Sequence, residues 1–487
     1  MGISSLAALA GLTLFRNMAG EPTFLMCSGL VLLLVCVSAV RTEYTRNSLV
    51  SPLALYGVLY SVHYGLPAIL VGLGVFGFSY AANTHYAGIA VIIALSSFAA
   101  YEIGISLARS SLRGLRAAPP VRRLWRRRRS VAGIVSLEVV GWLARFYVIS
   151  QGAFFQLTRV GTEPLGSSLH AAVRFLEYFP FYGYAVALVA CCLDDWQPPR
   201  RRIARHSATG LGTCEFMYWL LAGRKQEAIL VLILPVVARY IRTRRMPRWY
   251  VLAAAFFCVV VLFPTTFYYR TAMEKYVRAG ESWGEVARLS AQAALRGDEG
   301  VPEPGLIIFN RLNLLESVSA SVRLIEEGAW PKRLGHDYAD IVINFFPRFL
   351  WPDKPDYGYG TQFGRDASFL APSDYSTSIS VTYLGESFLN FGILGWLVFL
   401  PVGFISEVFF ARAFRAGDPS ATLYYLTILS PLMFLGGTAA LYGTGLLRVL
   451  IVLTAIAAFM RGSIRSPVPV RDGLGQDTAT TGSSFQT

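Results

Sequence analysis

The feature that most constrains the fold of this chain is a series of apolar runs, each about 20 residues long, that occupy most of its length. A helix of about 20 apolar residues crosses the hydrocarbon core of a bilayer with its backbone N–H and C=O groups paired. Hydrophobic residues make up 54% of the 487 residues and charged residues only 15%, whereas soluble domains carry about 25% charge. We therefore expect an all-α, polytopic membrane protein with about 11–12 transmembrane helices.

The apolar runs divide the chain into four parts. We expect N-terminal transmembrane helices with basic cytoplasmic loops in residues 1–268, and a large extracytoplasmic loop domain in residues 269–380. Residues 381–464 return to the membrane, and residues 465–487 are polar and low in complexity, which predicts a disordered tail. The expected spans are 22–40, 49–77, 84–108, 131–150, 168–193, 208–222, 226–241, 249–268, 381–411, 421–440 and 443–460, with 3–19 as a weaker one.

Positive charge is distributed unevenly between the loops. The formal net charge is +14, yet residues 270–380 contain 12 Lys/Arg against 15 Asp/Glu. The excess therefore lies in short loops between apolar runs, and residues 109–129 alone contain nine arginines. Because short loops rich in Lys and Arg stay in the cytoplasm, the pattern predicts a multi-pass protein of the plasma membrane whose C-terminus is cytoplasmic. It also argues against nucleic acid as a partner.

The sequence predicts neither a metal site nor a cofactor. Its six cysteines lie within or beside apolar runs, and no two of them form a CxxC pair. A disulfide framework and a thiolate metal site are therefore not expected. No HExxH, P-loop or GxSxG motif occurs, which removes the sequence support for zinc-protease, nucleotide and serine-hydrolase chemistry.

The large polar segment has the pattern of a small folded domain. Residues 285–296 and 307–328 have apolar residues at three- and four-residue spacing, which predicts two amphipathic helices. The following residues, 330–360, contain prolines that prevent a long helix and aromatic rings that suit a membrane interface. A domain that merely covers the membrane surface is the simplest interpretation.

Cationic residues in the expected outer segments are candidates for binding phosphate, because the positive-inside rule disfavours them there. Guanidinium groups match phosphate oxygens two at a time. The alternative is that these side chains only reach toward lipid headgroups. The candidates are Arg159, Arg224, Lys225, Arg270, Arg348 and Lys354.

Three residues are candidates for the base that activates an attacking hydroxyl. His336 lies in RLGHDYAD, beside Asp337 and four residues before Asp340, and an imidazole can accept a proton near neutral pH. Glu386, in YLGESFLNFG, lies where the chain is expected to re-enter the membrane. For each of them a structural ion pair is the alternative, so the identity of the base stays open.

The most specific segments resemble one family. They are the GRK turn at 223–225, the string FPRFLWPDKP at 346–355, and the NFG-x-x-G opening of the return span with Asn390, Phe391, Gly392 and Gly395. Together with the many spans and the large loop, they are similar to bacterial O-antigen and exopolysaccharide repeat-unit polymerases of the Wzy type. The similarity covers roughly residues 20 to 460.

The resemblance implies a metal-independent, inverting glycosyltransferase with a GT-C-like fold. Such an enzyme transfers a growing glycan from polyprenyl diphosphate to a lipid-linked oligosaccharide repeat unit on the outer face of the inner membrane. Membrane lipids and a chain-length regulator would be its other partners. By the same resemblance, Arg224 and then Arg348 would hold the diphosphate, and His336, Asp337 or Glu386 would activate the acceptor. An arginine followed eleven residues later by glycine, which some members carry, is absent at Arg159, Arg270 and Arg348.

Other interpretations are compatible with parts of the sequence. An O-antigen ligase has the same general plan, and a transferase that uses polyprenyl-monophosphate sugars would carry acidic residues in its first outer loop, where residues 78–84 have none. A flippase for lipid-linked sugars would show internal repeats and polar residues at mid-membrane. A scaffold for an assembly complex is a further alternative.

Overall fold

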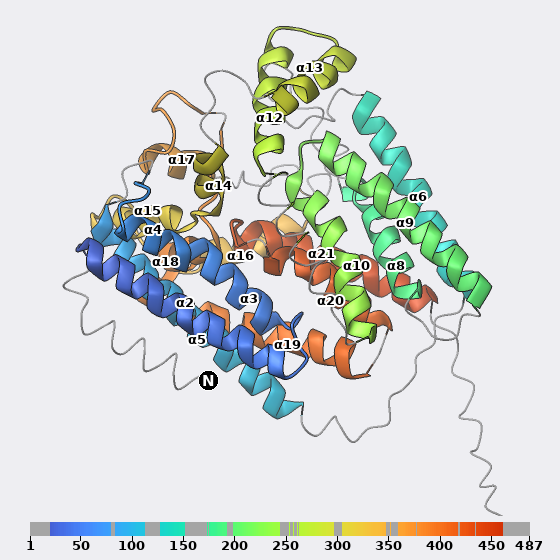
Figure 1. Ribbon diagram of the computed structural model, residues 1–487, viewed down its shortest axis with the longest axis horizontal. Coiled ribbons are helices and arrows are strands. Elements are labelled where there is room, and N and C mark those ends of the chain that lie inside the picture. Colours follow the sequence, from blue (N-terminus) through green and yellow to red (C-terminus); the bar gives the residue numbers. More distant parts are fainter. Residues whose placement is uncertain are drawn as a thin grey trace, which may run out of the picture.

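All the regular structure in the computed structural model is helical, over the residues that it describes (Figure 1). Those residues are 20–78, 83–112, 127–150, 173, 175–191, 198–243, 253, 257, 261, 263–296, 304–346, 351, 359–375, 377–416, 419–433 and 435–460. The expected all-α class is confirmed over this part of the chain.

Six helical stretches within the described residues are long and apolar enough to cross a membrane, in agreement with six of the predicted spans. They are α2 (Pro22–Thr45), the stretch of α3 (Pro52–Tyr60), η2 (Ser61–Gly65) and α4 (Leu66–Gly72), α5 (Thr84–Ser111), α6 (Arg127–Ser150), the stretch of α18 (Tyr383–Phe391), η5 (Gly392–Val398) and α19 (Phe399–Ala416), and α21 (Ala439–Met460). Four further predicted spans coincide with shorter or more polar helices: α8 (Phe179–Cys191), α9 (Pro198–Leu221), α10 (Lys225–Thr243) and α20 (Pro419–Met433). The predicted spans at 3–19 and, in the main, 249–268 lie outside the described residues.

Helix α5 forms the centre of one half of the bundle, and most of its residues are buried. It packs against α19 at two glycines. A Cβ atom on Gly104 would collide with the carbonyl oxygen of Leu400, and one on Gly403 with that of Tyr101. Small residues allow helix backbones to approach closely where lipid provides no hydrophobic driving force.

The two ends of α5 are tied to different parts of the molecule. Near its start, the Tyr86 hydroxyl donates to Glu327 at 3.0 Å, in the large polar segment. Near its end, Arg109 bonds to Glu43 at 2.8 Å and to Glu407 at 2.9 Å. The 23 residues of helix from Tyr86 to Arg109 span about 35 Å, close to the thickness of a bilayer core. The large segment and the charged cluster of Arg109, Glu43 and Glu407 therefore lie at opposite ends of the bundle.

Within the described residues, five helices lie in the large segment and a sixth, α12, begins before it and runs into it. They are α12 (Phe263–Arg278), α13 (Trp283–Arg296), α14 (Pro304–Leu312), α15 (Leu315–Glu326), α16 (His336–Phe345) and α17 (Tyr359–Asp366). Helix α13 matches the predicted helix 285–296, whereas the predicted helix 307–328 is divided into α14 and α15. At the break, Asn313 N still bonds to Phe309 O at 2.8 Å, while its side chain turns toward Glu316 at 3.5 Å.

Part of the large segment shares its hydrophobic core with the membrane helices. Phe309, Leu315, Val318 and Val322 belong to the same buried cluster as residues of α2 and α5. Figure 1 shows α14, α15 and α17 grouped together, with the α12–α13 pair projecting as a separate hairpin. Helices α14 and α15 are therefore built onto the bundle instead of being joined to it by a loose linker.

Candidate functional site

The site forms where the chain enters α16. Leu334 and Gly335 both have left-handed backbone angles, with φ of 50° and 87°. Glycine adopts this conformation at little cost, whereas Leu334 does so at a cost in strain, and its side chain is 79% exposed. The N–H groups of Arg333 and Leu334 donate, each at 3.0 Å, to the carbonyls of Leu389 and Asn390. The turn thus satisfies the last carbonyls of α18 and places His336 at the first position of α16.

Asn390 fastens this turn from the side of α18. Its Oδ1 accepts a bond from Gly335 N at 3.0 Å, and its Nδ2 donates to Asp337 Oδ2 and to the Glu386 carbonyl, both at 2.8 Å. The next residue, Phe391, stacks on Tyr338, with ring centroids 5.6 Å apart. Gly392 then turns the chain with φ of 58°. The NFG sequence therefore has a structural role: it attaches α18 to the start of α16.

Asp337 is fully buried and has partners on both carboxylate oxygens. Arg333 Nε lies 2.6 Å from Oδ1, and Asn390 donates to Oδ2. Its charge also lies in the first turn of α16, where the helix dipole favours an anion. The Arg333 guanidinium lies over the Tyr359 ring, 4.6 Å from its centroid. Asp337 is placed to hold the turn together.

Glu386 is also fully buried. One oxygen accepts a bond from the Tyr359 hydroxyl at 3.3 Å, and the other accepts from the backbone N–H of Ala439, at the start of α21. Burial, followed by the charges of Glu386 and Asp337, raises the pKa of Tyr359, so this hydroxyl remains a donor. Glu386 thus joins α17, α18 and α21.

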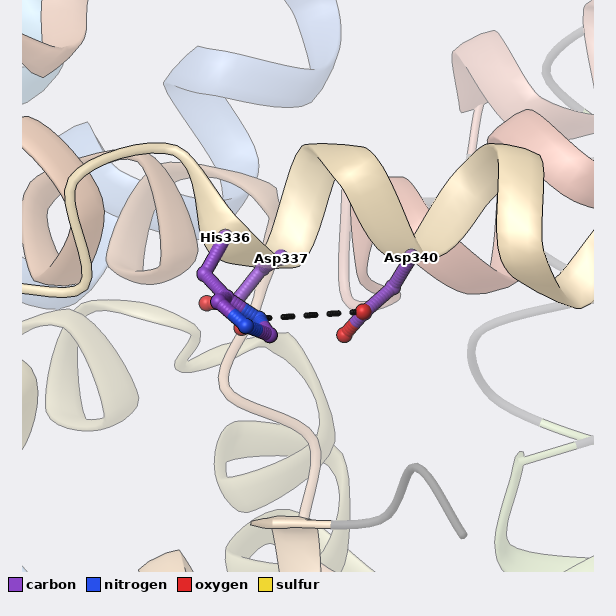
Figure 2. Close-up of side chains that lie close together, drawn as sticks. All are labelled: His336, Asp337 and Asp340. Atoms are coloured by element: carbon purple, nitrogen blue, oxygen red, sulfur yellow. Dashed lines mark ion pairs between the residues drawn. The ribbon is translucent and has the colours of Figure 1, made fainter. Parts of the chain in front are cut away.

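His336 differs from the other two candidates because its side chain is 69% exposed. Its Nδ1 lies 3.8 Å from Asp340 Oδ1, on the next turn of α16. Figure 2 shows the two side chains on the same side of the helix, with Asp337 beside them. Asp340 is only 2% exposed, and over the described residues its Oδ1 accepts no hydrogen bond. Burial first, and then the neighbouring Asp337, raise the pKa of Asp340.

The other end of α16 is fixed by α21. Arg448 Nη2 donates to the carbonyls of Asn344 at 2.5 Å and Phe345 at 3.3 Å, and Thr444 Oγ1 donates to Ile341 O at 3.1 Å. A cation at the C-terminal end of a helix is favourable to the helix dipole. Helix α16 is therefore held at both ends, and His336 is carried by a fixed element.

Arg224 lies in the turn between α9 and α10, and its side chain is only 10% exposed. Its Nη1 donates to the Tyr178 hydroxyl at 2.7 Å and lies 3.8 Å from Glu227 Oε1. The guanidinium also lies 5.2 Å from the centroid of the Trp219 ring. The structure therefore places Arg224 among internal partners, and it places His336 on a different group of helices.

A second buried network lies beneath Arg224. Arg145, which is fully buried in α6, forms a bidentate ion pair with Glu215 of α9 at 2.5 and 2.7 Å. Its Nε donates to the Glu177 carbonyl at 3.1 Å, and the Tyr218 hydroxyl donates to the Glu177 side chain at 2.6 Å. Arg145 and Glu215 thus join α6 to α9.

The remaining candidates are only partly visible. Arg159, Arg348 and Lys354 lie outside the described residues, and Lys225 and Arg270 are placed in α10 and α12 without described side chains. Sequence reasoning missed the roles of Arg333 and Tyr359. The four-residue spacing of Arg333 and Asp337 could have indicated their pairing, whereas nothing local in the sequence indicates Tyr359.

No family model, no curated protein and no solved structure matches this chain.

Proposed function

We propose that the protein is a bacterial membrane glycosyltransferase that polymerises polyprenyl-diphosphate-linked oligosaccharide repeat units on the outer face of the inner membrane. The observation that carries the proposal is the exposed imidazole of His336, which is held on a doubly anchored helix in the large segment. Of the three candidate bases, it alone can be reached by a substrate, because Asp337 and Glu386 are buried.

In this reaction the hydroxyl oxygen of the acceptor repeat unit attacks the anomeric carbon of the growing glycan. The new C–O bond forms as the bond between that carbon and the diphosphate oxygen breaks, with inversion at the carbon. His336 takes the proton of the hydroxyl, and the bonding electron pair leaves with the polyprenyl diphosphate. General-base catalysis of this kind contributes about 10²- to 10⁴-fold to the rate.

Cationic side chains stabilise the negative charge of the leaving diphosphate in this proposal. Arg224 keeps its role as the first candidate, with Lys225, Arg348, Lys354, Arg159 and Arg270 as further ones. A charge-assisted hydrogen bond contributes about 1.5–3 kcal/mol. Asp337 and Glu386 are not the base in this proposal; they hold the helices that position His336.

The test is a reaction of the purified protein with polyprenyl-diphosphate repeat units, followed by separation of the products by length. The proposal predicts a ladder of glycans in the presence of a chelator, about 10²- to 10⁴-fold slower for His336→Ala. His206→Ala, which removes another exposed histidine on α9, is the matched control and should leave the ladder unchanged. Transfer only to a lipid core would favour a ligase, and movement of intact repeat units across vesicles without elongation would favour a flippase.

A further inference from the structure

Helix α16 brings three metal-ligating side chains together on two successive turns. His336, Asp337 and Asp340 occupy positions i, i+1 and i+4, and their ligand atoms all lie within 4.8 Å of one another (Figure 2). We propose that they form a binding site for a divalent transition-metal ion of the zinc class, and that the bound ion inhibits the enzyme. The inhibitory consequence rests on the proposed function, whereas the binding itself does not.

The pair of His336 and Asp340 needs only a small adjustment to hold an ion between them. His336 Nδ1 and Asp340 Oδ1 are 3.8 Å apart. Two ligands of a tetrahedral ion, each about 2.1 Å from the metal, lie about 3.4 Å apart. Because the imidazole is largely exposed, a rotation of its side chain can close this difference of about 0.4 Å.

One buried carboxylate oxygen of this cluster has no hydrogen-bond donor among the described residues. Arg333 is paired with Asp337 at 2.6 Å. Over the described residues, Asp340 Oδ1 is buried and has no hydrogen-bond partner, although it faces the imidazole. A buried carboxylate oxygen without a donor is costly, and a cation at this position would satisfy it. Asp337 can remain bonded to Arg333 and Asn390 while it offers a further lone pair.

A metal ion at Nδ1 would change what the imidazole can do. A neutral imidazole that ligates through one nitrogen carries its proton on the other. With Nδ1 bound to the ion, Nε2 is protonated and cannot accept the proton of the acceptor hydroxyl. Zinc would therefore block the base without any change in fold.

Direct binding tests the site. Zinc is titrated into the purified full-length protein against a fluorescent zinc indicator, and the number of ions bound is compared between variants. The wild type should bind one equivalent more than His336→Ala and one more than Asp340→Asn, while His206→Ala and His85→Ala should match the wild type. All variants keep the same cysteines, so any zinc that the cysteines bind is the same in every variant and does not affect the comparison. His336 is exposed, so its replacement by Ala leaves the packing of α16 intact. An equal number of ions in the wild type and in His336→Ala overturns the site.

The inhibitory role has its own measurement. Ladder formation by the wild type should fall at least tenfold as zinc saturates the site and should recover when a chelator is added, whereas Mg²⁺ at the same concentration should have no such effect. An unchanged ladder with zinc bound at His336 overturns the inhibition. If no ladder forms under any condition but the extra equivalent binds, the proposed function fails and the metal site stands.

Discussion

Two clusters of this molecule pair carboxylates with a guanidinium. We term the first the sealed cluster; it consists of Arg145, Glu215, Glu177 and Tyr218. We term the second the open cluster; it consists of Arg333, Asp337, Asn390, His336 and Asp340. In the sealed cluster Arg145 is fully buried; its ion pair with Glu215 joins α6 to α9, and its bond to the Glu177 carbonyl reaches the turn before α8. In the open cluster one pairing, between Arg333 and Asp337, anchors the turn, and His336 stays exposed.

The difference shows that a charged residue in such a chain can have two roles. A buried ion pair is weak evidence for stability, but its disruption is costly because the remaining charge has no partner. In the open cluster the exposed imidazole of His336 faces Asp340 Oδ1, a buried oxygen that has no hydrogen-bond partner among the described residues. The open cluster is therefore where chemistry is expected, and the sealed cluster is where the helices are held in register.

Arg145→Met should have the largest effect on folding. It would leave the Glu215 carboxylate buried without its guanidinium, which costs about 3–5 kcal/mol. Thermal unfolding of the purified protein measures the loss. The double variant Arg145→Met/Glu215→Leu should recover most of it, because the carboxylate that Arg145 pairs with is removed together with the guanidinium. A single variant as stable as the wild type would contradict the role of the sealed cluster.

Arg224→Ala tests whether Arg224 binds substrate, as we expect for the open cluster, or only holds helices together, as the sealed cluster does. If Arg224 binds diphosphate, its removal should slow ladder formation by about 10- to 150-fold, the equivalent of about 1.5–3 kcal/mol. Tyr178→Phe is the matched control, because it removes an internal partner of Arg224 but keeps the guanidinium. Equal losses of activity in the two variants would show that Arg224 only supports the structure.

Asn390→Ala should loosen the open cluster. It removes the bonds to Asp337 and Gly335 and leaves buried groups with fewer partners, at a cost of about 1–3 kcal/mol. A double-mutant cycle with Asp337→Asn, followed by thermal unfolding, measures the coupling between the two side chains. Strictly additive effects would mean that the bond between Asn390 and Asp337 does not hold the turn.

Much of the fold follows from local sequence, whereas the open cluster does not. Six of the predicted spans and helix α13 could be located because apolar length and spacing are local properties. The break at Asn313 could not, because the apolar spacing continues through residues 307–328 although the helix does not. Likewise, His336 and Glu386 were named as candidates, but only the fold reveals that Glu386 is bonded to α21 and that His336 is exposed. The bond between Asn390 and Asp337 joins residues far apart in the chain, which no local pattern can show.

Arg448→Gln should have the smallest effect. It removes a cation from the C-terminal end of α16, where such interactions contribute about 0.3–2 kcal/mol. The unfolding temperature should fall by a few degrees, and ladder formation should fall only slightly, because the other end of α16 keeps its anchor. A loss of activity as large as that of His336→Ala would mean that the position of α16 depends mainly on α21.

The central claim is that the open cluster faces away from the cytoplasm. Leu334→Cys, beside His336, and Arg46→Cys, after α2, are exposed positions near the two ends of the bundle. Each is treated with a membrane-impermeant maleimide in intact spheroplasts, with the unsubstituted protein as the measure of background labelling. The account predicts that Leu334→Cys reacts in intact spheroplasts and that Arg46→Cys reacts only after lysis. The reverse order would place the open cluster in the cytoplasm and contradict the proposed reaction.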